Sequence, residues 1–312
     1  MATLSYHEQK DIENIKKLRE LQKELPSFCS DFFRGIETST STRTRIAYAY
    51  DLKIFFQFLK AANPGTFDNP SHTLTPSDLE KLTVTDLEEY IDYLKCHPSD
   101  TNEDVINTER GLMRKVSSLR SFYSYFFRNE RIEKNPAALV RMPKLHEKEI
   151  IRLEIDEVAK LLDEVEEGDK LTEKQKLYHE RTKVRDLAMM SLLLGTGIRV
   201  SECVGLNIND IDLDTCGARV YRKGGKESVI YFSDEVRDVL ENYLDEREMI
   251  DAVPGNEDAL FLSMQRKRIN VRIRETCHTA EKDHSTQAPQ HLRYKPLPGN
   301  RRYLPRRLRL RP

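Results

Sequence analysis

Apolar residues recur at helical spacing through most of the first 140 residues. They predict four helices, over residues 13–25, 44–61, 79–94 and 105–127. The clearest apolar stripe lies on the second helix and consists of Ile46, Tyr50, Ile54, Phe55 and Phe58. Asn135–Pro136 closes this region, because the residue before a proline is disfavoured in helical geometry.

The pattern changes after a polar, proline-containing segment at residues 141–148, which we interpret as an interdomain linker. Beyond it the spacing predicts helices over residues 155–165 and 185–194, a short helix from Ser201, and a helix opened by Ser233. Residues 218–222 and 228–232 read as two strands of a hairpin, and residues 258–263 as a further short strand. No periodicity is visible after about residue 272.

These patterns predict a mainly α protein with a small α+β part. The length of 312 residues favours two domains. We expect a helical domain over residues 1–140, the linker at 141–148, a mixed domain with a short β-hairpin sheet over 149–275, and a poorly ordered basic tail over 276–312.

Composition excludes several classes of protein. No stretch approaches the ~18 apolar residues of a membrane span, and no signal-peptide core is visible. The five cysteines form no Cys-x-x-Cys pair, so the sequence indicates neither a disulfide framework nor a zinc site, and a reducing cytoplasm is the expected location.

The net charge of −1 conceals an asymmetry. Residues 291–312 carry +8 with no acidic residue, which leaves −9 on the rest of the chain. A basic tail on an acidic body is typical of a nucleic-acid-binding arm, and it is equally typical of sequence never selected as protein.

Two local motifs suggest chemistry. In Gly195-Thr-Gly-Ile-Arg199-Val-Ser-Glu202, an apolar helix ends in a glycine turn that delivers one arginine, whose planar guanidinium suits bidentate phosphate contact. The alternative from spacing alone is an ion pair between Arg199 and Glu202. The second motif is the basic hairpin Lys223-Gly-Gly-Lys226, in which a lysine can act as a proton donor or simply be solvated.

In this order and spacing, the two motifs resemble the tyrosine recombinase (phage integrase) family, closest to its Xer-like members. The resemblance covers about residues 10–270. It includes residues 42–52 and 115–123, which are similar to the family's core-binding, SAM-like helical domain, and residues 206–212, which follow the Arg199 motif.

The resemblance implies a mechanism and the residues that carry it. A tyrosine hydroxyl attacks a DNA phosphodiester, two arginines stabilise charge on the phosphoryl oxygens, and a hairpin lysine protonates the leaving oxygen. Neither a metal nor another cofactor is needed. Arg199 corresponds to the first arginine and Lys223 to the lysine.

The family's second cluster, His-x-x-Arg followed by the tyrosine, is missing. His291-Leu-Arg293 has the wrong spacing, and the prolines and arginines around Tyr303 do not build a helix. Reading the codons of residues 285–296 from their second base permits Pro-His-Lys-Leu-Arg-Ser-Thr-Tyr-Gly-Thr-Asn-Leu, which restores His-x-x-Arg. We therefore interpret residues 276–312 as out-of-frame translation after a frameshift, with an evolved basic DNA-binding arm as the alternative.

Basic residues outside the motifs have two interpretations. Arg110 and Arg114 share a helix face at i and i+4, a spacing that by itself favours a solvated surface. With the resemblance, DNA-backbone contact is expected, as it is for the other basic candidates, Arg43, Arg45, Arg120 and Lys226.

The predicted function is site-specific recombination or integration of double-stranded DNA, which in the family involves a homotetramer. The chain as given is expected to be incomplete and incompetent in strand exchange. The alternative is a non-catalytic DNA-binding protein that occupies recombination sites or interferes with a full-length recombinase.

Overall fold

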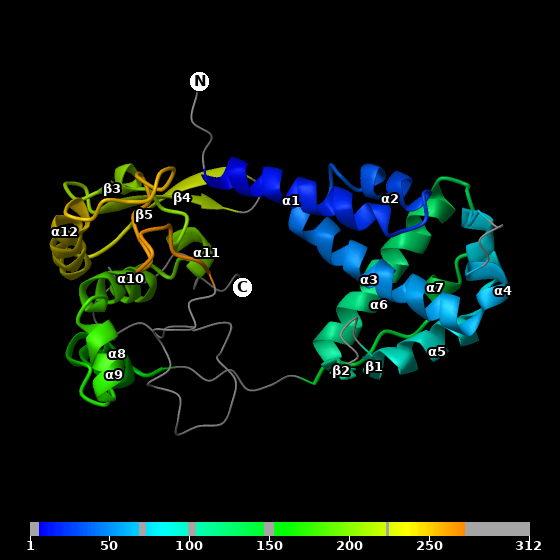
Figure 1. The fold of residues 1–312 in the computed structure, drawn as a ribbon, viewed down its shortest axis with the longest axis horizontal. Coiled ribbons are helices and arrows are strands. Elements are labelled where there is room, and N and C mark those ends of the chain that lie inside the picture. Colours follow the sequence, from blue (N-terminus) through cyan, green and yellow to red (C-terminus); the bar gives the residue numbers. More distant parts are fainter. Residues whose placement is uncertain (1–5, 69–72, 99–103, 147–152, 223–224, 272–312) are drawn as a thin grey trace, which may run out of the picture. The chain divides into compact units, whose positions relative to one another are not determined.

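The chain forms two compact units, residues 1–148 and 149–312, each with its own apolar core. A computed structural model describes residues 6–68, 73–98, 104–146, 153–222 and 225–271 (Figure 1). Lys223 and the tail at 276–312 lie outside the described residues. Among the described helices, none has the length and apolar character that crossing a membrane requires.

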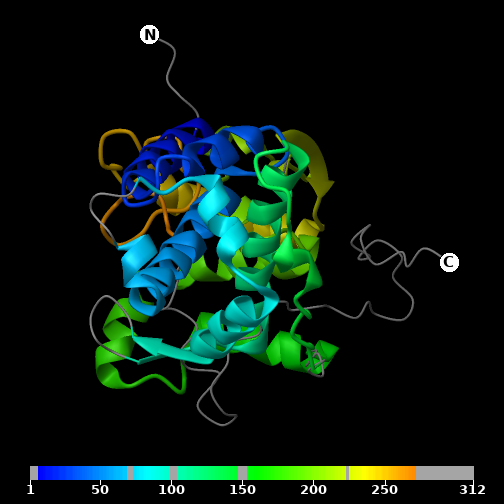
Figure 2. The same cartoon turned by 90° about the vertical axis from the view of Figure 1, so that its right-hand side faces the viewer.

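The first unit is a helical bundle with one small antiparallel ribbon (Figure 2). Its elements are α1 (Tyr6–Lys23), α2 (Cys29–Gly35), α3 (Thr42–Ala62), α4 (Pro64–Phe67), the 3-10 helix η1 (Pro76–Lys81), α5 (Val84–Lys95), β1 (Cys96–Pro98), β2 (Asp104–Ile106), α6 (Glu109–Arg128) and α7 (Pro136–Leu139).

Polar caps fix where the two central helices of this unit begin. The hydroxyl of Ser41 accepts a hydrogen bond from the backbone N–H of Thr44 at the start of α3, and Thr108 does the same for Gly111 at the start of α6. Each cap satisfies a backbone donor that has no partner inside the helix.

Aromatic side chains fill the space between α2, α3 and α6. Phe122 of α6 meets Phe32 and Phe56 edge-on, with ring centroids 5.2 and 6.2 Å apart, and Phe126 meets Phe28 in the same way at 5.4 Å. Edge-to-face pairs of this kind add to the stabilisation from burial. This cluster holds α3 and α6 side by side.

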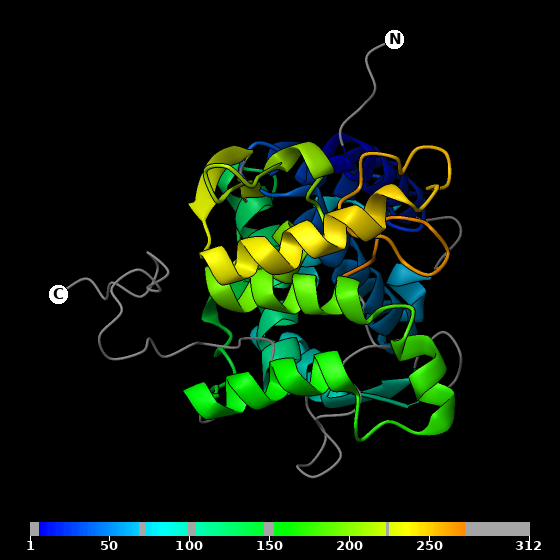
Figure 3. The ribbon, with the colours of Figure 1, turned by 90° about the vertical axis from the view of Figure 1, so that its left-hand side faces the viewer.

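The second unit combines a row of helices with a three-stranded antiparallel sheet, ordered β3-β4-β5. Figure 3 shows α12 and α8 on either side of α10. Its elements are α8 (Ile155–Glu167), α9 (Glu173–His179), α10 (Lys183–Thr196), α11 (Val200–Cys203), the 3-10 helix η2 (Ile208–Asp210), β3 (Ile211–Asp212), β4 (Gly217–Arg222), β5 (Lys226–Tyr231) and α12 (Asp234–Glu248).

The structure confirms the expected fold class and corrects several elements. The helix expected over residues 79–94 is two helices, η1 and α5, because Thr83 caps a new start by accepting from the N–H of Asp86. Residues 104–106 form β2 rather than the first turn of α6. Residues 258–263 form no strand and contribute only isolated bridges, such as Asn207 with Ala259. The pattern gave no indication of α2 or of the β1–β2 ribbon.

We expect Gly35→Ala to destabilise the first unit by about 1–3 kcal/mol, the usual cost of overpacking. A Cβ at this position would overlap the ring of Tyr125, which Phe32 and Phe126 hold edge-on. Gly65→Ala is the matched control, because its Cβ would meet nothing within 4 Å. Thermal unfolding of the full chain measures both, and equal melting temperatures would contradict the packing at Gly35.

Candidate nucleic-acid interface and catalytic turn

A groove of about 500 Å³ lies on the first unit between α3 and α6. Three of the predicted DNA-binding arginines, Arg43, Arg110 and Arg114, line it. The remaining lining residues are small, polar or apolar: Thr44, Ala47, Tyr48, Met113 and Ser117. No acidic side chain is among them, so the wall of the groove is basic.

Helical spacing brings these arginines together. Arg110 and Arg114 are one turn apart on α6, and Arg43 lies in the first turn of α3. Arg43 and Arg110 are exposed and have no hydrogen bond or ion pair within the described part of the chain. Their donors are therefore available to a phosphate.

Arg114 differs because it has a protein partner. Its Nη1 forms an ion pair with Oδ2 of Asp51, a carboxylate on α3 that is only 2% exposed, while the Arg114 side chain remains 46% exposed. Burial raises the pKa of Asp51, and the attraction of Arg114 only partly opposes that rise. Sequence reasoning missed Asp51; the available signal was an acidic residue next to the apolar stripe of α3.

Arg45 and Arg120 have internal partners and do not line the groove. Arg45 is 8% exposed, and its Nη1 is 2.7 Å from Oε1 of Glu37. Arg120 donates to the carbonyl oxygens of Ala137, Ala138 and Val140. In this arrangement both side chains connect parts of the first unit.

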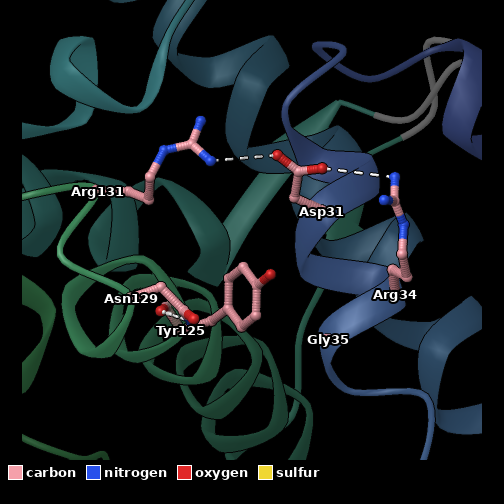
Figure 4. A pocket seen from close by; sticks show the side chains of 6 residues that line it. All are labelled: Asp31, Arg34, Gly35, Tyr125, Asn129 and Arg131. Carbon is pink, nitrogen blue, oxygen red and sulfur yellow. Dashed lines mark hydrogen bonds and ion pairs between the residues drawn. The ribbon is translucent and has the colours of Figure 1, made fainter.

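A second pocket, of about 390 Å³, lies between α2 and the end of α6 (Figure 4). Asp31 stands between Arg34 and Arg131, with 3.5 Å to a guanidinium nitrogen of each. Because one carboxylate serves both arginines, this pocket is less basic than the groove.

In the second unit, α10 ends at the predicted glycine turn. Gly197 is left-handed, with φ of 65°, and its N–H donates to the carbonyl of Leu193. The hydroxyl of Thr196 donates to the carbonyl of Leu192, one turn back. A left-handed residue reverses the chain direction at a helix end, and Arg199 follows two residues after Gly197.

Arg199 is the N-cap residue of α11 and is paired with Glu202. The backbone N–H of Arg199 donates to Oε2 of Glu202 at 2.9 Å, and its Nη1 lies 2.5 Å from Oε1. The Arg199 side chain is nevertheless 48% exposed, whereas Glu202 is 8% exposed. The ion pair expected from spacing is therefore present, and it holds the guanidinium at the surface with donors remaining.

The two strands on either side of the basic motif pair with each other, as predicted. Arg222 of β4 pairs with Lys226 of β5, and α11 packs against β4. Lys226 is exposed at the start of β5. The turn that carries Arg199 and the strand leading to the hairpin therefore belong to one packed cluster.

Arg268 is a structural residue that the sequence pattern did not reveal. Its Nη1 donates to the carbonyls of Val204 and Leu206, and its Nη2 to Oδ1 of Asn207. These contacts fix the backbone immediately after α11. The described residues contain no group of three or more His, Cys, Asp and Glu side chains suited to holding a metal.

Comparisons with known proteins extend over both units. The profile of the phage integrase family matches residues 151–294, which runs beyond the boundary expected at residue 275. Tyrosine recombinase XerC of Caldanaerobacter subterraneus subsp. tengcongensis is 34% identical over 258 residues, covering 79% of this chain and 66% of that protein. Tyrosine recombinase XerS of Streptococcus uberis is 30% identical over 277 residues, covering 81% and 76%.

A solved structure shares the fold. The Tn1549 transposon integrase, in complex with a circular intermediate DNA, has a TM-score of 0.50 at 16% identity, covering 77% of this chain and 72% of that chain. A helical unit followed by a mixed unit is thus a fold that this chain shares with the integrase. The chain belongs to the phage integrase family and spans about two thirds of the length of the XerC relative.

We expect Gly197→Ala to destabilise the second unit by about 1–2 kcal/mol, because a Cβ is strained in the left-handed conformation. Gly197→Asn should cost less, since asparagine tolerates that conformation. Denaturant unfolding of the full chain measures the free energy of unfolding, which should decrease in the order glycine, asparagine, alanine at position 197. Indistinguishable unfolding of all three would show that the turn does not impose this conformation.

Proposed function

We propose that this chain binds double-stranded DNA through the α3–α6 groove and is an incomplete site-specific recombinase. The observation that carries the proposal is the convergence of Arg43, Arg110 and Arg114 on one groove without an acidic lining residue. Family membership supports it, and so does the Tn1549 integrase, whose structure contains DNA.

The groove arginines are suited to backbone contact. Guanidinium groups bind phosphate oxygens through paired N–H donors, and such contacts set position on the duplex without reading its sequence. Arg43 and Arg110 have free donors, and Arg114 has one nitrogen paired with Asp51 and others available. Arg45 and Arg120 would act indirectly, by holding the elements that present the groove.

For the second unit, we propose the family's phosphoryl-transfer chemistry. In that chemistry a tyrosine hydroxyl releases its proton to water as its oxygen bonds to phosphorus, the bond from phosphorus to the 5′ oxygen breaks, and Lys223 would supply the proton that makes the 5′ hydroxyl. Arg199 would neutralise charge on the phosphoryl oxygens. Its ion pair with Glu202 supports this role, because a guanidinium that is already oriented needs little rearrangement to meet a phosphate.

We further propose that the chain cannot complete strand exchange. Residues 276–312 supply no His-x-x-Arg, so a second charge-stabilising arginine is missing, and a shifted reading frame restores it. The frameshift is tested by sequencing the gene. A non-catalytic DNA-binding role, occupying recombination sites or interfering with a full-length recombinase, follows if binding persists without cleavage.

Duplex DNA binding should weaken steeply as salt rises, because each phosphate contact releases a condensed counterion. Arg43→Ala and Arg110→Ala should each reduce the slope of log K against log salt by about 0.9. Arg131→Ala is the control, since that arginine pairs with Asp31 outside the groove. Titrations of labelled duplex at several salt concentrations measure the slopes, and unchanged slopes in both groove variants would refute the interface.

A suicide DNA substrate should trap no phosphotyrosine adduct with the chain as given, because the second arginine and a helix-borne tyrosine are missing. Restoring the reading frame near codon 275 should recover the adduct. In that repaired chain Arg199→Ala should lower trapping by about 100-fold or more, the scale of losing one oxyanion-stabilising donor.

Denaturing gels resolve the adduct. Trapping by the unrepaired chain that disappears in Tyr303→Phe would overturn the frameshift interpretation and make the tail part of the active site.

A further inference from the structure

The carboxylate of Asp51 lies in the interior of the first unit, where an ionised group loses its hydration. It lies on α3 next to Leu52 and one turn before Phe55, and it is 2% exposed. Its Oδ2 accepts from Arg114, while Oδ1 is buried with no hydrogen-bond partner within the described part of the chain. The rise in the pKa of Asp51 caused by burial shows that its ionised form gains less from its neighbours than it loses in hydration.

The neighbouring cation does not replace Arg114 as a partner. Lys115 is also buried, and its Nζ donates to Oδ1 of Asn107, 2.8 Å away. Asn107 in turn donates to the carbonyl of Leu94. Lys115 therefore attracts the Asp51 carboxylate only as a nearby charge, and the ion pair of Asp51 is with Arg114.

Arg114 faces two ways. One guanidinium nitrogen reaches the buried carboxylate, and the side chain is still 46% exposed and lines the groove. Arg43 and Arg110 line the same groove without a described partner. The groove thus contains one arginine paired with a buried carboxylate and two without a partner in the described part of the chain.

We propose that Asp51 is a positioning residue: its buried carboxylate holds the Arg114 guanidinium at the groove wall, ready to receive a DNA phosphate. The inference rests on the proposed DNA-binding function of the groove. Ordering a long side chain opposes binding, and Asp51 imposes that order during folding instead of at the moment of contact. The remaining guanidinium donors can then meet a phosphate without breaking the ion pair.

Asp51→Asn distinguishes a role in positioning Arg114 from the effect of the negative charge of Asp51 on DNA affinity. The substitution keeps the shape and removes one negative charge next to the groove. If Asp51 only competed with DNA for Arg114, affinity would rise; if it positions Arg114, affinity should fall, by about 2- to 10-fold. In an Arg114→Ala background, Asp51→Asn should cause no further loss of affinity.

Asp78→Asn is the matched control. Asp78 is a second buried carboxylate of the same unit, 3% exposed and paired with Lys81, and it does not line the groove. Its substitution should leave DNA affinity unchanged. Thermal unfolding of each full-length variant verifies that binding is measured on folded protein.

A measurement without DNA tests directly whether Asp51 orders the Arg114 side chain. In ¹⁵N relaxation of the arginine side chains, the Nε–H group of Arg114 should be more ordered than those of Arg43 and Arg110, and Asp51→Asn should make it equally mobile. Equal mobility in the unsubstituted chain, or equal or tighter DNA binding by Asp51→Asn, would overturn the positioning role alone. Failure of the unsubstituted chain to bind duplex DNA would overturn the proposed function, and this inference with it.

Discussion

The packing of α3 against α6 is the contact on which the DNA-binding proposal depends. The two helices meet through edge-on aromatic rings, including Phe56 and Phe122, and through the ion pair of Asp51 with Arg114. The same contact that excludes water from the core sets the distance between the two walls of the groove. The backbone position of an arginine on either helix is therefore set by the close packing of the core beneath the groove.

The second unit also positions an arginine, but by different means. There a single arginine is placed by the backbone, through a left-handed glycine, an immediately following helix start, and a carboxylate three residues on. Arg268 fixes the chain just beyond α11 through two carbonyl oxygens and the side chain of Asn207. Local geometry and a few polar contacts hold Arg199, whereas in the first unit packing fixes the helices that carry the groove arginines, and only Arg114 is held by an ion pair.

Much of this architecture was predictable because it arises from short-range periodicity. The stripe on residues 44–61 and the glycine turn before Arg199 are local patterns, and the structure contains both. What escaped prediction depends on contacts distant in sequence. Asp51 and Arg114 are 63 residues apart, and Arg120 reaches carbonyls up to 20 residues away. The break at Thr83 was missed for another reason: a capping box competes with an apolar repeat that continues across it.

The three carbonyl contacts of Arg120 have a mechanical consequence. They attach residues 137–140 to the middle of α6, the helix whose first turns carry Arg110 and Arg114. A force applied to the chain after Val140 would therefore act on the middle of α6 through these hydrogen bonds. A displacement of residues 137–140 would therefore act on the same helix that carries two of the three groove arginines.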